Sequence, residues 1–133
     1  MKKFFVIMVT VTGLISCSKQ VSAPQGAASQ NMFFQNANVA VKDMAAKPTA
    51  ANTVTISFTT LFQNNISRIE LMSGTTANNF CTAQSVDISN SANSKSYSFT
   101  DASVKASTMY YLLRFKNNSG DYAYSSYVTV QVP

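Results

Sequence analysis

The stretch SKSYSFTD (94–101), followed by STMYYLLRFKNNSGDYAYSSYVTVQV (107–132), decides how this chain folds. Apolar and aromatic side chains recur there at every second residue, which is the period of a β-strand with one buried face. The recurring residues are Tyr97 and Phe99, then Met109, Tyr111, Leu113 and Phe115, then Val128, Val130 and Val132. Between the last two runs lies NNSGD (117–121), whose residues tolerate positive φ and form Asx turns. The pattern predicts a strand followed by a hairpin.

The same two-residue period runs through TVTISFTTLF (53–62). Val54, Ile56 and Phe58 alternate there with threonine and serine, so one face of this strand should be buried and the other wet. The expected strands cover residues 32–41, 53–62, 68–74, 80–88, 96–100, 108–116 and 122–132. No helical periodicity of useful length interrupts them. The sequence therefore predicts an all-β, immunoglobulin-like antiparallel β-sandwich of about seven strands.

One hydrophobic core accounts for the buried faces of these strands. The residues expected to face it are Val54, Ile56, Phe58, Ile69, Leu71, Phe80, Val86, Phe99, Tyr111, Leu113, Phe115, Val128 and Val130. Each large buried side chain contributes about 1.5 to 3 kcal/mol, so a core of this size offsets the chain entropy without a disulfide. By the same alternation, Glu70 is expected to face solvent.

Charge is sparse in this chain of 133 residues. Two of the ten basic residues, Lys2 and Lys3, belong to an N-terminal targeting segment, which leaves eight basic and five acidic side chains, a net charge of +3. The remaining cations are dispersed and do not alternate with a stacking platform, which argues against nucleic-acid binding. Few charges with abundant serine, threonine and asparagine are typical of a β-rich domain outside the cytoplasm.

The N-terminus reads as a signal peptide. A basic start is followed by an apolar run from Phe4 to Ile15, which is too short for a stable membrane span of about 20 residues. The run ends in LISC (14–17), which resembles the bacterial lipobox. That resemblance implies a diacylglyceryl thioether on Cys17, cleavage before Cys17 and acylation of the new terminus, a stable anchor in membrane lipid. The alternative is an ordinary secretory signal cleaved between Ser16 and Ala23.

These features divide the chain into three parts. Residues 1–16 form the lipoprotein signal peptide, 17–32 the lipidated cysteine with a small, polar, flexible tether, and 33–133 the sandwich. The Ser18-Lys19-Gln20 start resembles outer-membrane lipoproteins of the Bacteroidota, but no acidic residue follows the cysteine as in their surface-export signal. We therefore expect a lipid anchor in the outer membrane, on the periplasmic face rather than the cell surface.

The strand sequences resemble the fibronectin type III family. Residues 53–59 resemble its second strand, with Phe58 where the family usually has a buried tryptophan, and 111–115 resemble its sixth strand. A closer likeness, over about residues 50 to 132, is to fibronectin-like modules of secreted Bacteroidota proteins. The stretches that carry this likeness are IEL (69–71), Phe80, YSFTD (97–101), YYLL (110–113) and YS (124–125). The resemblance implies that Tyr111 is a structural corner residue, with its ring buried and its hydroxyl bonded to the main chain. Such sandwiches have many unrelated functions, so the resemblance implies the fold alone.

Candidate chemistry is scarce. The chain contains no histidine, which removes the commonest general base and the commonest metal ligand. Its acids are expected at strand ends, in turns or on the surface, and no spacing among them resembles a calcium loop. They are Asp43, Glu70, Asp87, Asp101 and Asp121. Cys81 is the only thiol left after lipidation, and we expect it to be a small, buried or half-buried side chain beside Phe80, an intermolecular disulfide being the alternative. We predict no enzyme, no cofactor and no metal.

The hairpin at the end of the chain carries the candidate binding surface. Tyr122 and Tyr124 lie near Asn117 and Asn118, and loop-borne aromatic residues with neutral polar neighbours are typical of recognition surfaces. The main hypothesis is a non-catalytic, lipid-anchored interaction or accessory module that binds a protein of the cell envelope. The alternative is a carbohydrate-binding lipoprotein that uses these tyrosines to bind a glycan. A small hydrolase is a third class, against which the absence of histidine argues.

Overall fold

The computed structural model describes residues 29–34 and 37–133, and these form nine strands and no helix. The strands are β1 (Ser29–Phe34), β2 (Ala37–Ala50), β3 (Thr53–Asn64), β4 (Ile66–Thr76), β5 (Asn79–Asp87), β6 (Lys95–Asp101), β7 (Thr108–Asn117), β8 (Tyr122–Tyr124) and β9 (Val128–Gln131). The prediction of an all-β chain is confirmed. Within this part of the chain, no helix has the length and apolar character that crossing a bilayer requires.

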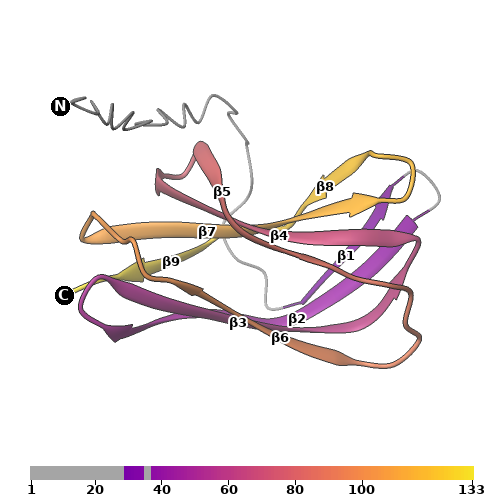
Figure 1. Ribbon diagram of the computed structural model, residues 1–133, viewed down its shortest axis with the longest axis horizontal. Helices are drawn as coiled ribbons and strands as arrows, with labels where there is room; N and C mark the ends of the chain where they lie inside the picture. The colour runs from indigo at the N-terminus through magenta and orange to yellow at the C-terminus, as the bar shows by residue number, and fades with distance from the viewer. Residues whose placement is uncertain (1–28, 35–36) are drawn as a thin grey trace, which may run out of the picture.

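The strands form two antiparallel sheets that pack face to face (Figure 1). Sheet I has the order β1-β2-β3-β6, and sheet II has the order β5-β4-β7-β8, with β9 also paired to β7. Every named pairing is antiparallel. This arrangement confirms the predicted β-sandwich and is consistent with an immunoglobulin or fibronectin type III-like fold.

The strand count differs from the prediction of about seven because two predicted strands are divided. The first predicted strand, 32–41, is two antiparallel strands, β1 and β2, and β1 already begins at Ser29, within the segment expected to be a tether. The last predicted strand, 122–132, is β8 and β9, which pair with different halves of β7. Because β8 and β9 pair with two halves of the same strand, β7, they together form one interrupted edge strand of sheet II.

Ser125 causes the interruption of the last strand. Its backbone N–H donates to the carbonyl of Leu113 at 2.8 Å, while its hydroxyl oxygen accepts from the Leu113 N–H at 2.8 Å. A side-chain oxygen thus replaces the backbone carbonyl as the acceptor for β7. Buried backbone N–H groups need such a partner, so the chain leaves the regular ladder here without losing a hydrogen bond.

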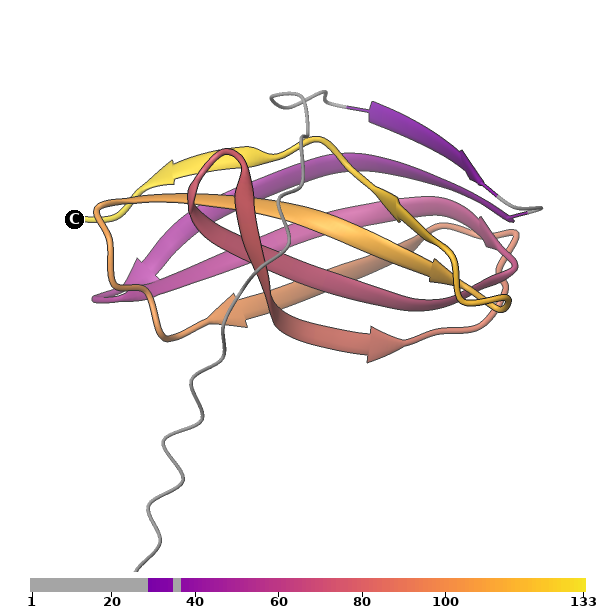
Figure 2. The same ribbon diagram turned by 90° about the horizontal axis from the view of Figure 1, so that it is seen from above.

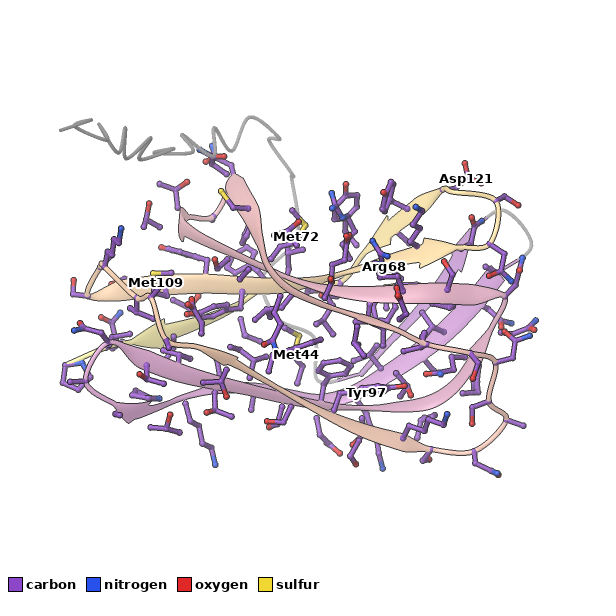
Figure 3. All side chains as sticks on the ribbon, viewed as in Figure 1. Met44, Arg68, Met72, Tyr97, Met109 and Asp121 are labelled. Carbon is purple, nitrogen blue, oxygen red and sulfur yellow. The ribbon has the colours of Figure 1, made fainter. Side chains whose placement is uncertain are left out.

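The main core lies between the two sheets. Most of the predicted inward residues are buried in it, whereas Val86 and Val128 are half-buried at its margin. Phe58, at the position where the resemblance has tryptophan, is 2% exposed, and its ring stacks on Tyr97 at 5.2 Å between centroids. Figure 3 shows Tyr97 between the layers and Met72 on the opposite side of sheet II. Phe80 is buried on that opposite side, not in the main core as predicted.

Tyr111 is buried as the sequence predicted, but its hydroxyl bonds to a side chain, so the predicted corner bond to the main chain is wrong. The ring is fully buried and the hydroxyl donates to Asp101 Oδ2 at 2.9 Å, rather than to the main chain. The other carboxylate oxygen of Asp101 accepts from the N–H and hydroxyl of Ser103. Burial, and then the hydrogen bond to Asp101 and its charge, raise the pKa of Tyr111 well above its ordinary value.

Gln63 closes the other end of the sandwich. Its buried amide oxygen accepts from the hydroxyls of Tyr97 at 2.9 Å and Thr60 at 3.2 Å, and its amide nitrogen donates to the carbonyl of Ser89 at 2.5 Å. The backbone groups of Gln63 and Ser91 exchange two hydrogen bonds of 2.8 Å. One residue of β3 therefore holds the connection that carries the chain from sheet II back to sheet I.

Candidate functional site

Asn117 builds the turn between β7 and β8 and does not belong to the exposed surface, which corrects its prediction as a binding residue. Its side chain is 1% exposed, and its amide oxygen accepts from the N–H groups of Ser119 and Asp121, both at 2.9 Å. Its amide nitrogen donates to Asp121 Oδ2 at 3.2 Å. Gly120, at φ 92°, supplies the left-handed residue that this turn needs.

Asn118 is exposed and fastens the tip of the hairpin to a second turn. Its side-chain nitrogen donates to Asn65 Oδ1 at 2.6 Å, and its N–H donates to the Asn65 carbonyl at 3.2 Å. Asn65, at φ 58°, is the residue between β3 and β4. The two turns therefore support each other, which places the hairpin on a fixed base.

Tyr122 is the exposed member of the predicted tyrosine pair. Its side chain is 38% exposed on the outer face of β8, in the strand register that brings it opposite Lys116. The guanidinium carbon of Arg114 lies 4.6 Å from the ring centroid and the Lys116 Nζ lies 5.9 Å from it. Cations within about 6 Å of an aromatic ring attract its π face. Tyr122 is thus an exposed aromatic ring with two cationic neighbours.

Tyr124 is half-buried because it covers a second hydrophobic cluster on the outer face of sheet II. Met72, Phe80 and Leu112 form the buried centre of this outer cluster. The residues packed around it are Tyr110, Tyr124 and Tyr127. The ring centroid of Tyr127 lies 5.5 Å from that of Tyr110 and 6.4 Å from that of Phe80. Most of the tyrosines of the final hairpin are therefore packing residues.

Glu70 lies beside the outer cluster and is buried, which corrects the prediction that it faces solvent. Its carboxylate forms an ion pair with Arg114, whose side chain is 11% exposed, and Arg114 also donates to the Thr82 hydroxyl at 3.2 Å. Burial opposes the charge of Arg114, but hydrogen bonds to Glu70 and Tyr124 outweigh it and raise its pKa above the ordinary value. Arg114 is therefore charged in this site.

The acids of the described residues are all engaged in structural contacts. Asp87 pairs with Arg68 at 2.7 Å on the surface of sheet II, and Asp43 lies 3.9 Å from Lys42. The contacts of Glu70, Asp101 and Asp121 are given above. Over residues 29–34 and 37–133, no group of three histidine, cysteine, aspartate or glutamate side chains is arranged to hold a metal ion.

Cys81 is half-buried in β5 and takes part in a disulfide bond. The half-buried position is as predicted, but the sulfur is not the free thiol that was expected. The sequence has one other cysteine, Cys17, which lies outside the described residues, as does the whole predicted signal peptide. A Cys17 sulfur that carries a thioether lipid is not available for a disulfide, so the chemical state of Cys17 decides between two forms of the chain.

Depressions on the surface lie away from the tyrosine pair. One is lined by Val86, Asp87, Ile88, Ser89, Lys95 and Tyr97, where the ends of β5 and β6 approach each other. Another is lined by Phe62, Gln63, Asn64, Asn90, Ser91 and Ala92, beside the connection that Gln63 holds. Tyr122 and Tyr124 line neither of them.

Comparison with known proteins gives no assignment. No family model matches the chain, and no curated protein matches its sequence.

Proposed function

We propose that this protein is a non-catalytic, lipid-anchored β-sandwich that serves as an interaction or accessory module in the bacterial cell envelope. The observation that carries the proposal is that the buried carboxylates of the chain stabilise its fold. The carboxylates of Glu70 and Asp101 are buried in contacts with Arg114, Tyr111 and Ser103 that hold the fold. A carboxylate needs access to a reacting group for acid or base chemistry. These groups stabilise a scaffold instead.

The anchor part of the proposal rests on the sequence. Cys17 lies two residues after the apolar run from Phe4 to Ile15, and the chain reaches the first strand at Ser29, so a short tether joins lipid to sandwich. A lipidated Cys17 holds the domain at the outer membrane, on the periplasmic face, and the disulfide of Cys81 is then formed with a cysteine of another chain.

Mass spectrometry of the protein purified from membranes tests the anchor. We expect the N-terminal peptide to begin at Cys17 and to carry the mass of three acyl chains, and we expect Cys17→Ala to leave the membrane fraction. Cys81→Ser, which removes the other cysteine, is the matched control and should stay with the membrane. A Cys17→Ala chain that still partitions with membranes, or an intact Cys17–Cys81 peptide, would refute lipidation.

A cross-linked pull-down of the full lipoprotein from its native envelope tests the module. One stoichiometric partner that is lost with Cys17→Ala supports an accessory subunit. If polysaccharide co-purifies instead, the proposed protein-binding module is wrong and carbohydrate binding becomes the proposed function.

Carbohydrate binding is the second candidate, and the exposed ring of Tyr122 favours it, because sugars stack on accessible aromatic rings. Tyr122→Ala should then abolish retention on a glycan affinity gel, while Tyr122→Phe should keep it. Tyr124→Ala is a poorer probe because it also opens the outer cluster. Equal retention of Tyr122→Ala and the unchanged chain would remove this candidate.

A further inference from the structure

Strand β6 is an edge of sheet I, and no strand in the described part of the chain pairs with its outer side. It pairs with β3 on one side only, through seven consecutive residue pairs without a register shift. Figure 2 shows β1 and β6 at opposite edges of sheet I. By contrast, the β5 edge of sheet II has register shifts against β4, and the opposite edge is split into the short strands β8 and β9. Bulges and short strands are how proteins keep an edge from pairing, and β6 has neither.

The backbone hydrogen-bonding phase shows which residues of β6 face outward. The Lys95 carbonyl is turned toward β3, where it accepts from the Thr60 hydroxyl at 3.4 Å, whereas the Thr100 N–H donates to Gln84 Oε1, on the side away from β3. Backbone groups alternate sides along an antiparallel strand. The N–H and C=O groups of Ser96, Ser98 and Thr100 therefore point to the open edge.

The outer face of β6 and β3 carries hydroxyls in matched rows. Ser96, Ser98 and Thr100 are exposed on β6 and stand opposite Thr59, Ser57 and Thr55 of β3, respectively. The hydroxyls of Thr59 and Ser96 lie 3.2 Å apart. Pairs of serine and threonine across strands stabilise a sheet, and no charge lies in these rows.

From this placement we infer that β6 pairs antiparallel with β6 of a second copy of the chain, with Ser98 facing Ser98 of that copy at the two-fold axis. This register pairs outward groups with outward groups, because Ser96 then faces Thr100 of the copy. It extends each hydroxyl row across four strands. Lys95, the cation of this strand, faces the position of Asp101 in the copy, so no like charges meet. The result is one continuous sheet of eight strands, a property that does not depend on the lipid anchor.

Among the described residues, the Gln84 side chain covers part of this edge. Gln84 is exposed and holds the Thr100 N–H from the neighbouring layer at 3.2 Å. A long, exposed side chain can rotate away, and on pairing the Thr100 N–H donates to the Ser96 carbonyl of the copy instead of to Gln84. The N–H groups nearest the two-fold axis, those of Ser98, face outward without this cap.

Disulfide trapping of the full chain in its own membrane tests the inference. Hydrogen-bonded residues facing each other across an antiparallel pair have Cα atoms about 5.5 Å apart, within the range that a disulfide bridges. Ser98→Cys should therefore give a dimer band on a non-reducing gel after mild oxidation, several-fold stronger than in the unchanged chain.

Ser57→Cys is the matched control. Ser57 is an exposed serine on the same face and in the same row, one strand further from the axis. Its sulfur would be separated from that of its copy by about three strand spacings, roughly 14 Å, too far for a disulfide. If Ser98→Cys stays monomeric, if Ser57→Cys dimerises equally, or if Ser98→Cys captures a different envelope protein, the inference is wrong.

The register has its own test. When copies with Ser96→Cys and copies with Thr100→Cys are expressed together, they should form a mixed disulfide. Copies with Ser96→Cys alone should not, because residue 96 and its counterpart lie four residues out of register. A strong band from Ser96→Cys alone would overturn this pairing.

Discussion

The outer faces of the two sheets differ in chemistry although their strands share one period. On sheet I, Thr55, Ser57 and Thr59 are half-buried or exposed, and they cover no hydrophobic cluster among the described residues. On sheet II, Met72 and Leu112 are buried under tyrosine rings, next to the pair of Glu70 and Arg114. The central strands of sheet II are therefore packed on both faces, and those of sheet I on one. Stability should depend on the outer face only in sheet II.

Neighbouring leucines of β7 give the largest expected effect. Leu113 points into the main core and Leu112 into the outer cluster, and both are fully buried. We expect Leu113→Ala to cost about 4 kcal/mol and Leu112→Ala about 3 kcal/mol in free energy of unfolding. Urea unfolding followed by tyrosine fluorescence measures both, since the chain has no tryptophan. A loss below about 1 kcal/mol for Leu112→Ala would mean that the outer face is not a packed layer.

The two ion pairs of sheet II sharpen the comparison. Glu70→Ala leaves Arg114 charged in a buried site, so we expect a loss of about 3 kcal/mol. Asp87→Ala removes the exposed pair with Arg68 and is the control, with a much smaller expected loss because solvent screens this pair. The same unfolding titration measures both. Equal losses would contradict the burial of the Glu70 pair.

Tyr111→Phe should cost about 1 to 2 kcal/mol in free energy of unfolding, because it removes one hydrogen bond of the buried Asp101 carboxylate and leaves the packed ring in place. Urea unfolding measures this loss.

The raised pKa of Tyr111 also predicts that stability depends on pH. The pKa of Tyr111 is higher in the folded chain than in the unfolded chain, where it is about 10. The protonated hydroxyl therefore stabilises the fold fully below about pH 10, and this stabilisation is lost as the pH rises from there toward the folded-state pKa. Between about pH 9 and about pH 11, the free energy of unfolding should therefore fall more for the unchanged chain than for Tyr111→Phe. An identical fall would show that Tyr111 titrates normally.

The smallest effect is expected on the outer face of sheet I. Thr59→Ala removes the hydroxyl contact with Ser96, which is solvent-exposed, so we expect a change within about 0.5 kcal/mol. Thermal unfolding measured by circular dichroism is sufficient. A loss above about 2 kcal/mol would place a packed layer on this face as well.

The sequence predicted best where one face of a strand is wet. In β3, threonine and serine alternate with Val54, Ile56 and Phe58, and the structure buries these three residues. In β7 the run MYYLL (109–113) is apolar on both faces, which indicates a strand buried on both sides, and this signal was available. Alternation with Ile69 and Leu71 directs Glu70 to the outer face of sheet II, but this face is packed rather than wet, so Glu70 is buried.

The candidate site depended on contacts that local sequence does not carry. The run NNSGD predicted the turn, but whether Asn117 points outward or completes the turn depends on its bonds to Ser119 and Asp121. The interruption at Ser125 depends likewise on Leu113, which lies on another strand. Such choices are set by the tertiary environment, because each side chain has local and long-range partners of similar strength.

Gln63 has a consequence for local opening of the molecule. The connection between β5 and β6 has one isolated backbone bridge, Gln63 to Ser91, and the side chain of Gln63 adds the bond to the Ser89 carbonyl. Amide hydrogen exchange occurs when such contacts break. The amides of Gln63 and Ser91 should therefore exchange with deuterium at one common rate, as a single opening unit that leaves both sheets intact.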